Sequence, residues 1–498
     1  MAEILENLGS GFLSIGAPLP LCVIAIGVAT GIFVGAMPGL SPSMGVALLV
    51  PFTYSMSADL AVILLTAVYL AADYGGSITA VMINTPGTPA AAATVLDGYP
   101  LTQLGRPGVG LGVSLVASSV GGLIGTVVLM LFSEPLAEFA SRFNSQEYFA
   151  IAVFGLTSVA SVGGKSALRA LAMAAMGLLI ATIGVDQIQT NVSRFSFGLS
   201  ALDDGFSLIP ILIGLFAISE VCLQIEKQNL SVVKSKNAAS DWPSWSEYWR
   251  LKVTILRSSI IGTVIGIFPG AGATIASFVS YDVAKRLSKE PEKFGHGSEE
   301  GVAASEAANS SSVGGALVPL LTLGIPGSAS TAVLIGALMI HDVIPGPDMI
   351  KDQSKLVYGL FASLFVANLF LLLLGSFGSR VWIRVSAIPK PILFPLILAA
   401  AVVGSFAVRY SLFDVATCLS FGVVGWLLRS NDFPVVPIVL GMVLGSVIED
   451  NLRRAVNATG FEGFLERPIS LLILGLAAAI AVVPILQKWR HRKRTSNE

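Results

Sequence analysis

The stretch GIFVGAMPGLSPSMG, residues 31–45, is an apolar segment interrupted by a Pro-Gly pair. A matching stretch, GTVIGIFPGAGATIA, occupies residues 262–276, and its spaced glycines and its Pro-Gly pair fall 231 positions after those of the first. Proline removes a backbone donor and glycine permits a left-handed backbone, so each pair is expected to break a helix. The constant offset indicates an internal repeat.

The composition places most of the chain in a lipid bilayer. Of 498 residues, 54% are hydrophobic and 12% are charged, and the mean hydropathy is +0.79. Uncharged runs long enough to cross a hydrocarbon core of roughly 30 Å occur at 7–58, 107–133, 258–281, 307–340 and 356–379. We therefore predict an all-α polytopic membrane protein with about 10–13 membrane segments. We expect two inverted-topology repeats with broken helices and re-entrant hairpins.

The distribution of charge divides the chain. A hydrophilic linker at 226–257 separates a first transmembrane repeat, 1–225, from a second repeat with C-terminal spans, 258–487, and a basic tail follows at 488–498. Loops rich in Lys and Arg stay cytoplasmic, so the linker and the tail are predicted to lie there. No basic residue precedes Arg106, so the acidic N-terminus is free to lie outside. With the N-terminus outside and the linker in the cytoplasm, the two copies would enter the membrane from opposite sides, as an inverted repeat requires. We expect no cleaved signal peptide, because a basic n-region is missing.

A second pair of breaks follows the first. YGGS at 74–77 leads into NTPGTP at 84–89, and VGGA at 313–316 leads into LGIPGSA at 323–329, an offset of 239 to 240. Irregular backbone inside a membrane is tolerated where it lines a protected cavity, and paired broken helices point to a transporter's binding site. The new helix N-termini would suit a carboxylate. Carbonyls of the preceding half-helices, with neighbouring hydroxyls, would equally suit a hard cation such as sodium.

The breaks and the polar residues beside them form the candidate substrate- and cation-binding set. Its members are Pro38, Gly39, Ser41, Ser43, Asp73, Gly76, Ser77, Asn84, Thr85, Pro86, Gly87, Thr88, Pro269, Gly270, Gly272, Thr274, Asn309, Ser310, Ser311, Gly314, Pro326, Gly327, Ser328, Ser330 and Thr331. Within the set, Asn84, Thr85, Asn309 and Ser310 are candidate ligands of a sodium ion. A single Pro-Gly is often only a kink, and the GxxxG spacing also suits close helix packing. The matched pairing of the breaks favours a binding site, and the same motifs can serve both helix packing and ligand binding.

Two carboxylates lie within apolar stretches. Asp73 directly precedes YGGS, and Glu306 lies shortly before VGGA. A charge inside a membrane is costly and usually functional, so both are candidates for cation coordination or proton coupling. The alternative places each at a membrane interface, where water solvates a carboxylate. The four break motifs contain no Lys or Arg, which predicts that binding of a di- or tricarboxylate depends on a co-transported cation.

The same motifs resemble those of a known family. The segments GIFVGAMPGLSPSMGVALLVPFTY, YGGSITAVMINTPGTPAAAATVLDGYPL, GTVIGIFPGAGATIASFVSYDVAKR and LTLGIPGSASTAVLIGALMIHDVIPGP are similar to those of the large membrane subunit of the tripartite tricarboxylate transporters. The resemblance implies a carrier in the bacterial cytoplasmic (inner) membrane that takes up carboxylates such as citrate by symport with Na+ or H+. It also implies two partners, a small four-span membrane subunit and a periplasmic solute-binding protein. Likeness to other ion-coupled carriers with paired hairpins implies an elevator-like motion.

Other classes of function find less support in the sequence. His296, His341 and His491 have no catalytic or metal-ligand spacing, and the chain contains no GxxxxGK[ST] motif. We therefore predict no enzymatic activity, no cofactor besides the coupling ion and no nucleic-acid partner. Two alternatives are an ion channel, which would need a continuous polar file or a charged ring, and an intramembrane enzyme, which would need a catalytic carboxylate pair or an activated nucleophile.

Overall fold

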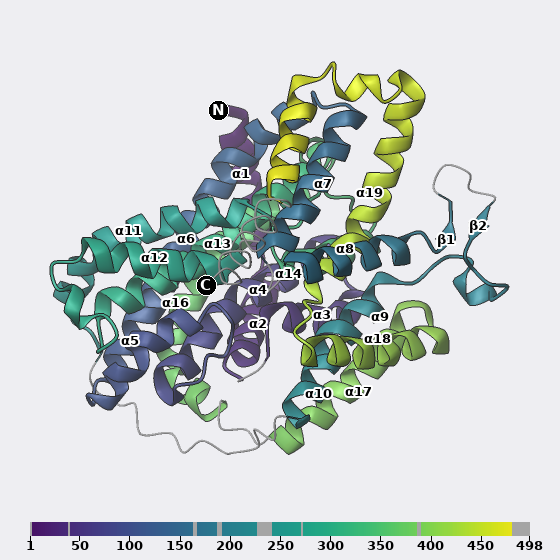
Figure 1. Ribbon diagram of the computed structural model, residues 1–498. Coiled ribbons are helices and arrows are strands. Elements are labelled where there is room, and N and C mark those ends of the chain that lie inside the picture. The colour runs from purple at the N-terminus through teal and green to yellow at the C-terminus, as the bar shows by residue number, and fades with distance from the viewer. Residues whose placement is uncertain are drawn as a thin grey trace, which may run out of the picture.

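The computed structural model describes residues 2–37, 40–162, 167–186, 192–226, 242–269, 272–385 and 390–480. Within these ranges the chain is helical almost throughout, and the one sheet pairs two short antiparallel strands, β1 (Gly184–Val185) and β2 (Ser193–Arg194) (Figure 1). The predicted all-α class is confirmed. The labelled α-helices are α1 (Ala2–Ile15), α2 (Pro18–Gly35), α3 (Pro42–Thr53), α4 (Ala58–Ile83), α5 (Ala92–Gln103), α6 (Pro107–Ala140), α7 (Ser145–Val162), α8 (Ala167–Ala181), α9 (Leu208–Leu212), α10 (Ser219–Glu226), α11 (Trp245–Ile267), α12 (Gly272–Leu287), α13 (Glu299–Leu323), α14 (Ala329–Ile340), α15 (Pro347–Asp352), α16 (Ser354–Val385), α17 (Lys390–Arg409), α18 (Leu412–Ser430) and α19 (Val436–Thr459). A further short helix, Pro468–Ile480, follows α19.

Seven helical segments of the described ranges are long and apolar enough to cross a membrane, and four shorter helices are apolar as well. The long segments are α2, α4, α6, α16, α17, α18 and the run Leu208–Glu226, in which a π-helical turn joins α9 to α10. Large apolar side chains such as Phe132 on α6 and Leu396 on α17 are exposed, which suits contact with lipid. By contrast, α4 is buried along nearly its whole length. The protein is therefore a multi-pass membrane protein built around α4.

One succession of helices occurs twice. Helices α2 to α6 have 18, 12, 26, 12 and 34 residues, and α11, α12, α13, α14 and α16 have 23, 16, 25, 12 and 32. Breaks follow the first and the third helix of each set, where the sequence analysis placed them. The third helix ends each time on a left-handed residue, Asn84 with φ 56° and Gly324 with φ 70°. The opposite orientation of the two sets across a membrane stays a prediction.

Glycine brings the first and third helices of each set into direct backbone contact. A Cβ atom on Gly35 of α2 would lie 2.1 Å from the carbonyl oxygen of Ala72 in α4, and one on Gly266 of α11 would lie 2.5 Å from that of Ser312 in α13. Any larger residue would push these helices apart. The GxxxG spacing therefore does serve close packing, as one of its two interpretations predicted.

The packing also fixes how the two Gly-Gly pairs correspond. Gly75 lies against α2, where an added Cβ would be 2.6 Å from the Ile32 carbonyl oxygen. Gly315 lies against α11 in the same way, 2.3 Å from the Thr263 carbonyl oxygen. Gly75 therefore corresponds to Gly315, 240 positions later, whereas the sequence comparison aligned it with Gly314. The alignment by residue identity was therefore wrong by one position, because only contacts with the neighbouring helix distinguish adjacent glycines.

Helix α11 begins inside the stretch predicted as the linker. It starts at Trp245, includes the basic residues Arg250 and Arg257, and continues without interruption into the uncharged residues 258–267. The boundary expected after residue 257 thus falls within a continuous helix. Residues 227–241 of the linker and the basic tail lie outside the described residues.

Candidate functional site

All four breaks contribute to one cavity of about 420 Å³. The starts of α3, α12 and α14 and the turn before α5 form most of its wall, and α4 and α19 complete it. A volume of this size suits a small organic ligand. The lining residues are Ser41, Pro42, Ser43, Tyr69, Asp73, Pro89, Ala90, Gly272, Ala273, Thr274, Ile275, Ser328, Ala329, Ser330, Val436 and Leu440.

Three helices begin at this cavity. Ser41 caps α3, with its Oγ accepting from the backbone N of Met44 at 3.2 Å, and Ser328 caps α14, with its Oγ accepting from the backbone N of Thr331 at 3.2 Å. Helix α12 begins at Gly272, which itself lines the cavity. Helix N-termini carry partial positive charge and unpaired amides. Three of them around one space favour an anionic ligand without any basic side chain.

Asp73 is the one ionisable acid among the lining residues, all of which are described, and no Lys, Arg or His is among them. Its side chain is only 4% exposed, and its Oδ2 has no hydrogen-bond partner among the described residues. Burying a carboxylate oxygen without a partner is costly. This oxygen is therefore suited to receive a cation or a proton.

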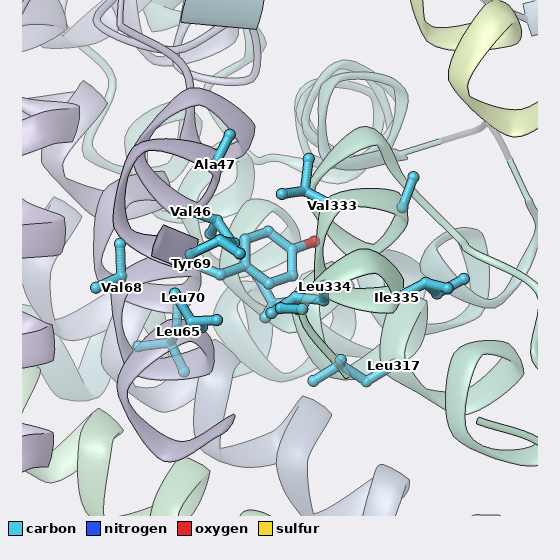
Figure 2. Packing of buried hydrophobic residues seen from close by; sticks show 14 of the residues in the cluster. Val46, Ala47, Leu65, Val68, Tyr69, Leu70, Leu317, Val333, Leu334 and Ile335 are labelled. Carbon is cyan, nitrogen blue, oxygen red and sulfur yellow. The ribbon is translucent and has the colours of Figure 1, made fainter. Parts of the chain in front are cut away.

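Tyr69 connects the central helix of the first set to the second set. It lies one turn before Asp73 on α4, and its hydroxyl is 3.1 Å from the Oγ of Ser328 at the start of α14. Figure 2 shows the Tyr69 ring among apolar side chains of α3, α4 and α14, such as Val46 and Val333, with its hydroxyl on the α14 side. The ring fills the core while the hydroxyl reaches the cavity wall.

A buried polar cluster continues from Asp73 into the protein. Glu306 of α13 is wholly buried and accepts hydrogen bonds from Thr94 of α5 and, at 2.9 Å, from the Oγ of Ser118 of α6. Asn309 lies one turn further on α13, where its Nδ2 donates to the carbonyl oxygen of Asp73 at 3.3 Å and its Oδ1 is unpartnered among the described residues. Protein therefore encloses both carboxylates, and neither is an exposed group at an interface.

Other candidate residues shape the breaks without lining the cavity. The amide of Gly87 donates to the carbonyl oxygen of Gly76 at 3.1 Å, and the Thr88 Oγ1 accepts from the backbone N of Ala91 at 3.3 Å, which folds the break at 84–89 tightly onto α4. Pro38, Gly39 and Gly270 lie outside the described residues. The remaining candidates that do not line the cavity are Ser77, Asn84, Thr85, Pro86, Pro269, Asn309, Ser310, Ser311, Gly314, Pro326, Gly327 and Thr331.

Two of the four residues named as sodium ligands, Asn84 and Asn309, lie far apart. Asn309 contacts the backbone of Asp73. Asn84 lies eleven residues beyond Asp73 along α4 and is exposed. At about 1.5 Å per residue this separation is roughly 16 Å, so Asn84 and Asn309 cannot bind the same ion. Asp73 and Asn309 are the pair that the fold brings together.

The sequence analysis missed three notable residues of the cavity wall. Tyr69 carried a signal, since a tyrosine inside the apolar run AVILLTAVYLAA needs a partner for its hydroxyl. Val436 and Leu440 of α19 carried none, because this helix lies outside both repeated sets and only tertiary contact brings it to the cavity.

A multi-pass membrane protein whose broken helices meet around one cavity has the architecture of a membrane transporter. The profile described as "Tripartite tricarboxylate transporter TctA family" matches residues 21–440, and the chain belongs to this family. It is accordingly the large membrane subunit of a tripartite transporter, a class that by its name has further components.

One relative matches this chain over nearly its full length, and a second matches about half of it. An Agrobacterium vitis protein named "Uncharacterized 52.8 kDa protein in TAR-I ttuC' 3'region" is 36% identical over 495 residues, which cover 99% of this chain and 98% of the relative. A second protein of that organism, "Uncharacterized protein in TAR-II ttuC' 3'region", is 37% identical over 234 residues, 47% of this chain and 97% of the relative. No solved structure shows significant similarity to the chain.

Proposed function

We propose that this subunit imports di- or tricarboxylates, or related organic acids, by symport with a cation, Na+ in the first instance. The observation that carries the proposal is the cavity in which three helix N-termini meet Asp73 and no basic side chain is present. The partners would be a small four-span membrane subunit and a periplasmic solute-binding protein, and the complex would lie in the bacterial inner membrane.

The chemistry of the wall supports coupling between substrate and cation. A carboxylate at the starts of α3, α12 and α14 would be stabilised by their amides, yet it would share a poorly solvated space with the carboxylate of Asp73. Two like charges at such a distance repel strongly in a low dielectric. A cation held by Asp73 and the Oδ1 of Asn309 would remove this repulsion, so each ligand would raise the affinity for the other.

Alternating access would be elevator-like in this proposal. The starts of α3 and α14 belong to different sets but reach one cavity, and Tyr69 of α4 links the first set to α14 through Ser328. The broken helices would therefore carry the ligand as one body, moving against the remaining helices. Such movement needs surfaces with discrete alternative packings.

The test is uptake by the complete complex in proteoliposomes. Radiolabelled citrate and tartrate, loaded on the binding protein, are offered with an inward Na+ gradient, with a proton gradient of equal size, or with no gradient. We expect uptake against a concentration gradient that requires Na+. Uptake that merely equilibrates the label, with the same rate in all three conditions, would indicate a channel and contradict symport.

A further inference from the structure

A second cavity, which we call the α11 cleft, lies between α11 and the connection from α12 to α13. Its volume is about 740 Å³, and it shares no lining residue with the cavity at the breaks. Five Lys and Arg side chains and three Glu side chains line it, so its wall carries a net positive charge. The lining residues are Leu104, Arg106, Arg250, Val253, Thr254, Arg257, Leu287, Ser288, Lys289, Glu290, Lys293, His296, Gly297, Ser298, Glu299 and Glu300.

The acidic residues of the α11 cleft neutralise only part of this basic charge. Glu299 is shared between Arg106 at 3.0 Å and Arg250 at 2.5 Å, and Glu290 pairs with Lys293 at 2.7 Å. Among the described residues, Arg257 and Lys289 take part in no such ion pair, although both line the cleft.

Arg257 is the most informative of these cations. It is half-buried, and its Nε is enclosed and has no hydrogen-bond partner among the described residues. An enclosed guanidinium donor is costly to leave unpaired, and the planar guanidinium is well matched to phosphate oxygens. A half-buried arginine in a basic cleft therefore points to an anionic ligand.

The surroundings of the α11 cleft point to a lipid as the source of that anion. Trp249, Val253, Leu256, Ile260 and Val264 form an exposed apolar stripe along α11. Val253 belongs both to this stripe and to the cleft wall, so the cleft adjoins the exposed apolar side of the helix. Tryptophan and basic residues together mark the headgroup level of a bilayer, and Lys252 lies 3.9 Å from the centre of the Trp249 ring.

We propose that the α11 cleft binds the headgroup of an anionic phospholipid. The phosphate contacts Arg257 and Lys289, and the acyl chains follow the stripe from Val253 to Val264. Basic pockets beside membrane helices recognise lipid headgroups through the same chemistry. The site is independent of the transport proposal, because it uses a different cavity. A soluble phosphate shares the headgroup chemistry but cannot use the apolar stripe.

The experiment measures thermal unfolding of the purified full-length protein in detergent. Phosphatidylglycerol, phosphatidylcholine with the same acyl chains, and inorganic phosphate are titrated separately. Arg257→Gln and Lys289→Gln are compared with Arg286→Gln, a matched control on α12 whose exposed side chain pairs with Asp282 outside the cleft. Lys289 is exposed, so its replacement tests the site even if Arg257→Gln folds poorly.

Phosphatidylglycerol is expected to raise the unfolding temperature of the wild type and of Arg286→Gln equally, whereas the other two additives leave it unchanged. One basic contact near a membrane surface contributes about 1 kcal/mol, so each cleft variant should need roughly fivefold more phosphatidylglycerol for the same shift. Equal shifts with phosphatidylcholine, an equal shift with inorganic phosphate, or cleft variants that respond like the wild type would each overturn the proposal.

Discussion

The two sets of helices, α2–α6 and α11–α16, share a scaffold but differ in their polar residues. Gly35 and Gly266 hold the first helix of each set against the third in the same register. The acidic residue of the cavity has no such counterpart, because the position 240 residues after Asp73 is Val313. Tyr69 likewise corresponds to Asn309. Small residues needed for close packing are thus repeated, while the residues available for ligand chemistry differ between the sets.

This difference suggests how the work of the site is divided. The first set supplies the carboxylate of Asp73, and the second supplies the amide of Asn309 and the buried Glu306. Each set alone provides breaks and helix N-termini, but only their combination brings Asp73 together with Asn309.

Removing the unrepeated acid should abolish most transport. In Asp73→Asn the cavity keeps its shape but loses the charge that would hold the cation. A charge-assisted contact is worth about 1.5–3 kcal/mol, so Na+-driven uptake by the reconstituted complex should fall roughly 10- to 100-fold. Asp59→Asn, an exposed residue at the start of the same helix, is the control. Unimpaired uptake by Asp73→Asn would refute the assigned role.

Asp97 of α5 holds the connection between α12 and α13 in place, again without an equivalent in the other set, because the corresponding helix α14 contains no acidic residue. Its Oδ1 accepts from the backbone N of Gly295, Gly297 and Ser298 at 2.8, 2.9 and 2.8 Å, and its Oδ2 accepts from the Tyr281 hydroxyl at 2.8 Å.

Asp97→Ala would leave these donors without a partner, at a cost of about 1–3 kcal/mol for each buried group. We expect the free energy of unfolding to fall by about 3 kcal/mol or more, measured by thermal unfolding of the detergent-solubilised protein. Asp59→Ala should change it little, because its side chain is exposed. A similar stability for both variants would show that these contacts contribute nothing.

The repeated glycines should respond alike. In Gly35→Ala and in Gly266→Ala the new methyl group meets the backbone of the neighbouring helix, and overpacking of this kind costs about 1–3 kcal/mol. Gly9→Ala on α1 has nothing within 4 Å of the added Cβ and serves as the matched control. If unfolding measurements placed either packing variant at or above the stability of Gly9→Ala, the shared scaffold would be in doubt.

The link between the sets through Tyr69 should have the smallest effect. Tyr69→Phe removes one hydroxyl contact with Ser328 while the ring stays packed, so stability should fall by about 1 kcal/mol. Ser328→Ala also removes the cap of α14 and should cost more, and the double variant should cost less than the sum. A strictly additive double-mutant cycle would mean that the two hydroxyls do not interact.

The sequence predicted features that depend on local backbone chemistry. Proline and glycine mark the breaks, and the left-handed ends at Asn84 and Gly324 follow the residue types found there. The sequence alone could not predict contacts between residues that are far apart along the chain. Tyr69 and Ser328 are 259 positions apart, and Asp97 and Ser298 are 201 apart, with no periodicity that relates them. The same holds for α19, which joins the cavity wall from outside both sets.

Substrate protection of a single cysteine tests whether the carboxylate and Na+ bind together in the cavity at the breaks. Ser330, at the cavity wall, is replaced by cysteine in a complex whose large subunit has Cys22, Cys222 and Cys418 replaced by alanine, and Asn84→Cys is the control at a break but outside the cavity. The rate of modification by a small thiol reagent is measured with and without a transported carboxylate and Na+. We expect substrate with Na+ to slow modification at position 330 several-fold and to leave position 84 unchanged. Identical rates at position 330 under all conditions would contradict this expectation.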